Sequence, residues 1–290
     1  MASAVEPPRV AVVEAVGRAL AEDLTPLGDL TSALLPADLA ARAAFVVRTP
    51  GVLAGTACAT ETFDQLGGGV VLEWLAADGD AVGAGATIAT ITGPMATILT
   101  GERTALNFLG HLSGIATLTR RFVDAAGGVG AARVWDTRKT TPGLRSLEKA
   151  AVRAGGGSNH RGNLSDWILL KDNHLALMGI TGAVTAARDR WPARTVHVEC
   201  DRLDQVAEAL DAGADALLLD NMSPDQVSDC VRAADEHAAA TGRRRPLLEV
   251  SGGISLETIV RYAGLGVDLI SVGGLTNSAP VLDIGLDIEP

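Results

Sequence analysis

From residue 133 onward, short apolar runs, each with the length of a buried parallel strand, alternate with stretches of helical periodicity. The runs cover residues 133–137, 167–172, 195–200, 216–221, 247–252 and 269–274. Two sets of apolar residues between the runs recur at helical spacing: Leu203, Val206, Ala207 and Leu210, then Leu256, Ile259, Val260 and Ala263. This regular alternation predicts an α/β fold with a parallel sheet.

A polar residue or a glycine stands at the end of each run. In chain order these residues are Arg138, Lys171, Glu199, Asp220, Ser251 and Gly273. The steps from Lys171 to Glu199, Asp220, Ser251 and Ser271 are 28, 21, 31 and 20 residues, which suits β-α units that close into a barrel. The carboxyl ends of barrel strands form the active-site face, so we expect these side chains to converge on one mouth. The alternative is that some of these residues are only loop residues or helix caps. Because six strand ends in succession carry such a residue, this alternative is the weaker one.

The first 115 residues follow a different pattern. One early helix is indicated by the apolar residues Val12, Val16 and Leu20, and short β-prone runs with turn signals follow. Residues 78–91 resemble the sandwich turns of biotinyl and lipoyl carrier domains, but a carrier modifies a lysine and none precedes Lys139. We therefore expect an amino-terminal α+β sandwich-like domain over residues 1–115, on which the tail 277–290 can pack. Residues 116–276 are expected to form the α/β barrel.

Positive charge is concentrated in one stretch of an acidic chain. The formal net charge is −11, and all three lysines, Lys139, Lys149 and Lys171, lie within residues 136–174. Lysine offers a point charge or a proton, which the rigid fork of arginine cannot replace. This stretch indicates a small anionic ligand. It is too short for the broad basic surfaces that bind nucleic acid or anionic membranes, so we expect neither partner.

Cysteine usage and the amino terminus bear on location. Cys58, Cys200 and Cys230 are odd in number and lack C-x-x-C spacing, so neither a disulfide framework nor a zinc site is indicated. The opening residues do not have a charged start followed by an apolar run, and no uncharged apolar span of membrane length occurs. These features predict a cytoplasmic protein with reduced thiols.

Two glycine pairs follow the last two predicted strands, at Gly252-Gly253 and Gly273-Gly274. Barrels commonly bind phosphate between their last two such loops, although ordinary turn glycines are the alternative. Glu199 and Asp220 end neighbouring strands, and two carboxylates at one cavity repel unless a cation or hydroxyl groups lie between them. A substrate that carries Mg²⁺ or a sugar would explain both. Salt bridges to Lys171 or Arg161 are the alternative, and the two interpretations are compatible.

Lys171 also permits a different enzyme class. A lysine at a barrel strand end beside a phosphate site is the arrangement of Schiff-base aldolases, in which neighbouring cations free the amine. Spacing alone does not separate an aldolase from a glycosyl transferase.

Longer motifs separate them. These are G-E-R-T-A-L-N at 101–107, D-T-R-K-T-T-P-G-L-R at 136–145, G-G-G-S-N-H-R at 155–161, L-L-K-D-N-H at 169–174, and L-L-D-N at 218–221. In this order and spacing, together with S-G-G and S-V-G-G, the chain resembles the quinolinate phosphoribosyltransferase family over essentially its whole length. Two departures occur: Gly162 follows Arg161 directly, with Asn163 at the usual glycine position, and the last loop ends in glycine where alanine is common.

The resemblance implies a fold, an activity and a set of site residues. The fold is an incomplete α/β barrel joined to the amino-terminal domain, in a homodimer or a higher oligomer. The activity joins quinolinate to 5-phosphoribosyl-1-diphosphate, with Mg²⁺, and yields nicotinate mononucleotide, diphosphate and CO₂ for NAD synthesis. The residues implied to lie around quinolinate are Thr137, Arg138, Lys139, His160 and Arg161, with Arg103 from the neighbouring subunit. Those implied for the phosphoribosyl diphosphate and its metal are Lys171, Glu199 and Asp220. Those implied for phosphate are Ser251, Gly252, Gly253, Val272, Gly273 and Gly274.

Within that set Lys139, Lys171, Glu199 and Asp220 are the candidate catalytic residues. A paralogous transferase that acts on another pyridine or aromatic acid remains the main alternative.

Overall fold

The structure is a computed structural model that describes residues 6–127 and 132–289. The chain divides into two compact units built from interleaved segments. The first unit comprises residues 1–120, 139–157 and 274–290, and the second comprises residues 121–138 and 158–273. The predicted division into residues 1–115 and 116–276 stays a prediction.

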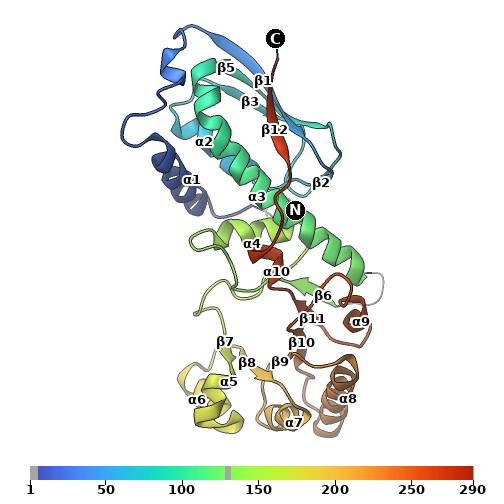
Figure 1. Cartoon of the computed structure of the whole chain (residues 1–290). Coiled ribbons are helices and arrows are strands. Elements are labelled where there is room, and N and C mark those ends of the chain that lie inside the picture. Colours follow the sequence, from blue (N-terminus) through green and yellow to red (C-terminus); the bar gives the residue numbers. More distant parts are fainter. Residues whose placement is uncertain (1–5, 128–131, 290) are drawn as a thin grey trace. The chain divides into compact units, whose positions relative to one another are not determined.

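An antiparallel sheet in the order β12-β1-β5-β3 forms the framework of the first unit (Figure 1). Its strands are β1 (Ala40–Val47), β3 (Val71–Trp74), β5 (Thr87–Pro94) and β12 (Ile284–Glu289). A separate ribbon pairs β2 (Gly51–Val52) with β4 (Ala81–Val82). Since β12 pairs with β1 over six residues, the C-terminal tail belongs to this sheet.

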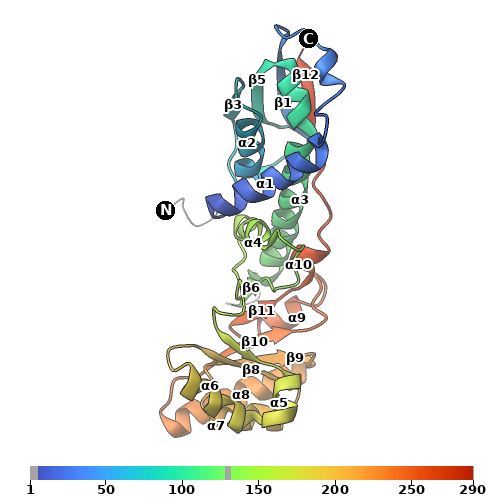
Figure 2. The ribbon, with the colours of Figure 1, turned by 90° about the vertical axis from the view of Figure 1, so that its left-hand side faces the viewer.

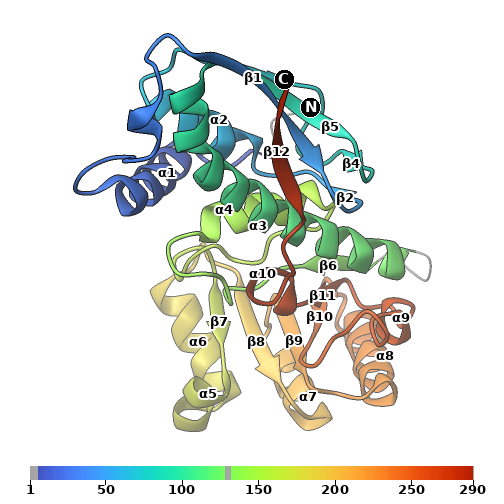
Figure 3. The same cartoon turned by 45° about the horizontal axis from the view of Figure 1, so that its top comes forward.

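The first unit also contains helices, which make it an α+β unit. They are α1 (Arg9–Leu24), the 3-10 helix η1 (Ser32–Leu34), α2 (Thr56–Gln65), α3 (Met95–Gly127), α4 (Arg145–Ala154) and α10 (Gly274–Asn277). Phe45 of β1, Phe63 of α2, Ile91 of β5 and Leu109 of α3 lie in one buried cluster, so α2 and α3 supply the layer that covers the sheet (Figure 3). Burial of these large apolar side chains is the main stabilising contribution to the unit.

A parallel sheet in the order β6-β11-β10-β9-β8-β7 forms the second unit. Its strands are β6 (Arg133–Trp135), β7 (Ile168–Leu170), β8 (Val196–Cys200), β9 (Ala216–Asp220), β10 (Leu247–Ser251) and β11 (Leu269–Ser271). Each lies within one of the six predicted runs, so the predicted parallel α/β sheet is confirmed. Among the residues described, no ladder joins the edge strands β6 and β7, so the barrel is open, as the expected incomplete barrel requires.

The helices of the second unit lie between successive strands along the chain. They are α5 (Asp172–Met178), α6 (Ile180–Arg190), α7 (Leu203–Asp211), α8 (Pro224–Thr241) and α9 (Val260–Ala263). Figures 2 and 3 show α6, α7 and α8 on one face of the sheet. The helix expected from Leu256 begins only at Val260, because Ser255 and Thr258 exchange backbone and side-chain hydrogen bonds that form a turn first.

The three cysteines, Cys58, Cys200 and Cys230, are unpaired and buried, as expected for a chain without a disulfide framework. In the part of the chain that the structure describes, none of the helices is long and apolar enough to cross a bilayer.

Candidate active site

Parallel strands place the predicted site residues along one edge of the second unit. Ser251 at the end of β10 lies opposite Asp220 at the end of β9, and Cys200 of β8 lies opposite Leu219 of β9. Glu199 lies opposite Leu218 and is therefore two residues short of the level of Asp220. Arg138, Lys171 and Gly273 follow the ends of β6, β7 and β11 on the same side of the sheet. The sheet thus brings together residues that are far apart in the sequence.

The segment that contains His160 and Arg161 is fastened beside β6. Ser158 forms a parallel bridge with Trp135 and donates its backbone N–H to the carbonyl oxygen of Val134 at 2.8 Å. Asp136, which is fully buried, accepts hydrogen bonds from the backbone N–H of His160 at 2.8 Å and from Nδ2 of Asn159 at 2.7 Å. A buried carboxylate needs such donors, so these bonds fix where His160 and Arg161 lie relative to β6.

Arg138 and Arg161 lie close enough to repel each other. Burial, and then the positive charge of Arg138, lower the pKa of Arg161 from its ordinary value, although the guanidinium remains charged. Arg161 also donates to the carbonyl oxygen of Trp167 at 3.3 Å. The Nε of Arg138 is buried and makes no hydrogen bond within the described structure. Two neighbouring guanidinium groups, one buried and one half-buried with an unused donor, favour an anionic ligand with planar carboxylates.

Lys171 and Glu199 form an ion pair, with 2.7 Å between Nζ and Oε2. The Lys171 side chain is 47% exposed and that of Glu199 13%, so the pair lies at the rim of the unit, within reach of a ligand from solvent. The sequence left open whether Glu199 binds a cation or pairs with Lys171, and the structure shows the pairing.

Asp220 and Glu199 line a common pocket of about 420 Å³. The other carboxylates in its lining are Asp172, Asp201, Asp204 and Glu208, and one arginine, Arg202, is among them. Asp220 also accepts a hydrogen bond from Nδ2 of Asn221 at 2.7 Å. Carboxylate oxygens in this density suit a hard cation such as Mg²⁺, which binds few protein carboxylates and completes its shell with water and phosphate oxygens.

The glycine loop after β10 passes very close to Asn221. Gly252 has φ +93°, and a Cβ placed there would lie 2.2 Å from Oδ1 of Asn221. Asn221 itself has φ +55° and donates its backbone N–H to the carbonyl oxygen of Ser251 at 2.9 Å. Only glycine fits this position without displacement of Asn221.

Three predicted residues belong to the first unit. Arg103 is an exposed residue of α3, Gly274 begins α10, and Lys139 precedes α4. The backbone carbonyl of Lys139 accepts a hydrogen bond from Oγ1 of Thr276 at 2.7 Å, so the segments that carry Lys139 and Gly274 are joined directly. Thr137 and Val272 lie in the second unit, at the strand ends of β6 and β11.

A second group of buried polar residues was missed by the sequence reasoning. Glu249 in the middle of β10 is fully buried, and its Oε2 lies 3.2 Å from Nε2 of His160 and 3.5 Å from Nε2 of His197 on β8. The indole rings of Trp135 and Trp167 lie 5.9 and 5.0 Å from the ring of His160. A charged residue inside an otherwise apolar strand run was the signal that could have identified Glu249.

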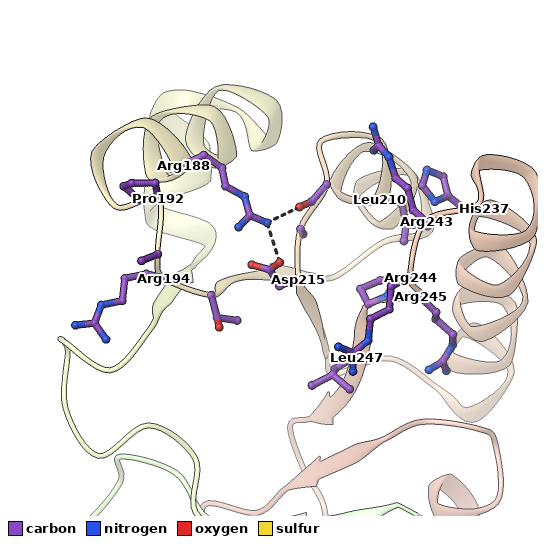
Figure 4. Close-up of a pocket in the computed structure, with 15 residues that line it drawn as sticks. Arg188, Pro192, Arg194, Leu210, Asp215, His237, Arg243, Arg244, Arg245 and Leu247 are labelled. Carbon is purple, nitrogen blue, oxygen red and sulfur yellow. Dashed lines mark hydrogen bonds and ion pairs between the residues drawn. The ribbon is translucent and has the colours of Figure 1, made fainter.

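A pocket of about 520 Å³ lies at the amino ends of β8, β9 and β10, at the opposite edge from the predicted residues (Figure 4). It is rich in arginine. Arg188 pairs with Asp215 at 2.8 Å and donates to the carbonyl oxygen of Gly213, and Arg245 pairs with Asp268 at 2.8 Å. Figure 4 shows Arg194 directed away from the other labelled arginines. None of the sequence-predicted site residues lines this pocket.

An open α/β barrel with basic residues, carboxylates and a glycine loop at its carboxyl edge, joined to an α+β unit, defines an enzyme of the α/β-barrel class that handles anionic substrates. Family models confirm and narrow this class. The quinolinate phosphoribosyl transferase N-terminal domain matches residues 29–113, and the C-terminal domain of the same family matches residues 115–287. The chain belongs to the quinolinate phosphoribosyl transferase family.

Individual relatives agree with the family match. The chain is 42% identical to the nicotinate-nucleotide pyrophosphorylase [carboxylating] of Mycobacterium leprae over 95% of this chain and 96% of that protein. It is 36% identical to quinolinate phosphoribosyltransferase [decarboxylating] 2b, mitochondrial, of Nicotiana tabacum over 95% and 82% of the two chains. The solved nicotinate-nucleotide pyrophosphorylase of Francisella tularensis superposes with a TM-score of 0.91 at 38% identity and covers 99% of each chain.

Proposed function

We propose that this protein transfers the phosphoribosyl group of 5-phosphoribosyl-1-diphosphate to quinolinate, with decarboxylation. In the proposed reaction the bond between the anomeric carbon and diphosphate breaks, and a bond from the same carbon to the pyridine nitrogen forms. The carboxylate next to that nitrogen leaves as CO₂, and its ring carbon takes up a proton. The products are nicotinate mononucleotide, diphosphate and CO₂, which places the enzyme in NAD biosynthesis.

The observation that carries this proposal is the pair of neighbouring guanidinium groups, Arg138 and Arg161, beside His160 in a chain of this family. Their mutual repulsion, which contributes to the lowered pKa of Arg161, would be relieved by a dicarboxylate. Each guanidinium can bind one carboxylate with paired N–H bonds. We assign the two carboxylates of quinolinate to these residues and to His160, with Lys139 close to both substrates and Thr137 beside them.

The phosphoribosyl diphosphate is assigned to the strand ends beyond. Lys171 and Glu199 are already paired, so Lys171 can turn from Glu199 to an incoming phosphate, or share it, with little movement. Ser251, Gly252 and Gly253 on one loop and Val272, Gly273 and Gly274 on the next supply backbone N–H groups for phosphate oxygens. Asp220 and Glu199 are on the side assigned to the ribose.

The carboxylates present fit the implied Mg²⁺, since Glu199 and Asp220 line one pocket with further oxygen donors. When bound, Mg²⁺ would neutralise negative charge on the departing diphosphate. The remaining steps depend on the protein. Glu199 and Asp220 stabilise positive character at the anomeric carbon, and Arg138 and Arg161 hold the pyridine nitrogen in line for attack. Once the nitrogen is quaternary, its positive charge stabilises the carbanion left by CO₂, and Lys139 is the candidate that protonates it.

The assembly and location are part of the proposal. We propose a homodimer, or a higher oligomer built from such dimers, in which Arg103 of one subunit completes the site of its partner, with no nucleic-acid or membrane partner. The exposed position of Arg103 on α3 is consistent with this role. A cytoplasmic location stays a prediction of the sequence.

The activity is tested by incubation of the purified protein with quinolinate, 5-phosphoribosyl-1-diphosphate and Mg²⁺. We expect diphosphate and CO₂ to be released in equal amounts and nicotinate mononucleotide to accumulate. Release of diphosphate without CO₂, or no turnover with quinolinate, would contradict the proposal. Addition of a chelator should stop the reaction and added Mg²⁺ should restore it, which tests the metal separately.

The paralogous transferase is distinguished by its acceptor. A site built for two carboxylates leaves one guanidinium group unpaired when nicotinic acid binds, so nicotinic acid should be at least about a hundredfold poorer than quinolinic acid in kcat/KM. Equal activity with both acids would favour the paralogue. The aldolase is tested with borohydride and a carbonyl substrate, which should trap no adduct on Lys171.

A further inference from the structure

Glu249 is a fully buried carboxylate that the proposed reaction does not use directly. It lies on β10, and the two histidines near it come from other elements: His197 from β8, two strands away in the sheet, and His160 from the segment bridged to β6. A carboxylate is rarely buried to this extent without a partner that needs its charge. The partner that needs the charge of Glu249 is therefore His160 or His197.

The three side chains are close enough to share protons. Oε2 of Glu249 lies 3.2 Å from Nε2 of His160, in a hydrogen bond, and 3.5 Å from Nε2 of His197. The rings of His160 and His197 are stacked, with centroids 5.9 Å apart and an interplanar angle of 27°. Glu249 thus contacts the edge of the His160 ring, and the His197 ring is stacked with the His160 ring.

The protonation states follow from the surroundings. Desolvation raises the pKa of Glu249, but the hydrogen bond with His160 and the two nearby histidines lower it below its ordinary value, so Glu249 is ionised. Burial lowers the pKa of His197. An ionised carboxylate only accepts hydrogen bonds. The proton between His160 and Glu249 must then be on Nε2 of His160, and this defines the tautomer of the ring.

His160 is held from other directions as well. Its backbone N–H donates to Asp136 at 2.8 Å, and the Trp167 and Trp135 rings approach its ring to 5.0 and 5.9 Å. A histidine fastened at its backbone, at its ring edge and on its faces has little freedom to rotate. Of these restraints, the bond to Glu249 is the one that also determines which ring nitrogen carries the proton.

We infer that Glu249 is a positioning residue: it holds His160 by Nε2 and sets the orientation in which His160 receives a carboxylate of the pyridine dicarboxylate. This inference rests on the proposed function, because it assigns the benefit to that substrate. The substrate carboxylate only accepts hydrogen bonds, so Nδ1 must donate to it in the complex, and the negative charge of Glu249 at Nε2 offsets the positive charge of that ring.

The test compares Glu249→Gln with the wild-type protein. Glutamine keeps the volume and can still accept a hydrogen bond, but it lacks the charge. We expect the KM for quinolinate to rise about tenfold, as for loss of one charge-assisted hydrogen bond, while the KM for 5-phosphoribosyl-1-diphosphate changes less than about twofold. Glu249→Asp keeps the charge and should recover part of the affinity. Equal increases in both KM values would indicate a general structural role and overturn the inference.

A double-mutant cycle decides whether Glu249 acts through His160. In a His160→Ala background, Glu249→Gln should have no further effect on the KM for quinolinate. An undiminished effect in that background would contradict the assignment. If the glutamine variant does not fold, the aspartate variant replaces it in the cycle.

The tautomer is observable without substrate. The chain has five histidines, so ¹⁵N-¹H correlation spectra of the imidazole rings can be assigned with His160→Ala and His197→Gln variants. We expect a proton on Nε2 of His160 in the wild-type protein and a changed His160 signal in Glu249→Gln. A proton on Nδ1 alone would overturn the inference. If the spectra agree but wild-type protein does not use quinolinate, the proposed function fails and the hydrogen bond stands.

One further outcome would replace the assignment. The candidate ligand atoms of His160, His197 and Glu249 all lie within 4.8 Å of one another, a spacing that a transition metal could bridge. Elemental analysis of the purified protein should find less than about 0.1 transition-metal ion per chain, far below the single ion that a structural site holds. One zinc ion per chain, retained on dialysis and lost in Glu249→Gln, would show that both histidines present lone pairs to a metal.

Discussion

Individual buried charges decide how the candidate site is held in shape. Asp136 is fully buried and accepts hydrogen bonds from His160 and Asn159 within the N-H-R segment. Glu249 is equally buried on β10. Both carboxylates hydrogen-bond with His160, which is proposed to contact substrate. At this scale the protein resembles other enzymes in which buried acids orient the groups that bind the ligand.

We expect Asp136→Ala to destabilise the protein by about 2–4 kcal/mol, because it leaves the buried backbone N–H of His160 and the amide of Asn159 without their acceptor. Urea unfolding at neutral pH measures the change. Asp201→Ala is the matched control, since the Asp201 side chain is 60% exposed and pairs only at the surface with Arg202. A variant as stable as the control would show that Asp136 does not hold the N-H-R segment.

Asp29 predicts a pH dependence of stability. Hydrogen bonds from the side chain and the backbone of Ser32 lower the pKa of Asp29 from 3.8 to about 2, with a further bond from Thr100 on α3. A lowered folded-state pKa stabilises the protein above the unfolded value and loses that contribution as pH falls from about 4 to about 2.

The corresponding variant is Asp29→Asn. Its urea midpoint should be lower than that of the wild-type protein at pH 6, and the difference should shrink as pH falls from 4 toward 2. Asp38→Asn, at an exposed position nearby, should show no such convergence. A constant difference across the whole range would mean that the charge of Asp29 is not what stabilises the folded state.

Strands and loops show which parts of the fold could be predicted from local pattern. All six predicted runs contain a strand of the parallel sheet, since a short apolar run bounded by polar residues is a local signal. The helix expected from Leu256 instead begins at Val260, because side-chain hydrogen bonds of Ser255 and Thr258 compete with the helix, and periodicity does not report such bonds.

The loop after β10 provides a prediction at the scale of an element. Gly252→Ala places a Cβ 2.2 Å from Oδ1 of Asn221 at a φ of +93°, so Asn221 and the loop must move. Strain of about 1–3 kcal/mol corresponds to a loss of about five- to 150-fold in affinity, which we expect in the KM for 5-phosphoribosyl-1-diphosphate.

Gly253→Ala is the control for this loop. Its φ is +61°, a region that alanine tolerates better, and nothing lies within 4 Å of the added Cβ. Steady-state kinetics should show a much smaller change than for Gly252→Ala. Similar losses in both variants would indicate that flexibility of the loop, and not its close approach to Asn221, controls phosphate binding.

For the whole molecule, the decisive question is whether one site draws on two subunits. We expect Arg103→Ala and Arg138→Ala each to abolish most activity. Mixed in equal amounts after exchange of subunits, the two variants should recover about a quarter of wild-type activity, because half of the dimers are hybrids and one of their two sites is intact. Activity of the mixture over time measures the rescue. A mixture no more active than its components would contradict a shared site and leave Arg103 without the proposed role.

The sequence by itself determined the alternation of strands and helices, the residues that end each strand and, through long motifs, the family. These signals are local, because the spacing of apolar residues and the identity of the next residue do not depend on distant partners. Only the tertiary structure decided that Glu199 pairs with Lys171, that residues 139–157 group with the first unit, and that Glu249 and His197 meet His160. Register and burial set those contacts, and both depend on which segments, distant in sequence, lie side by side in the folded chain.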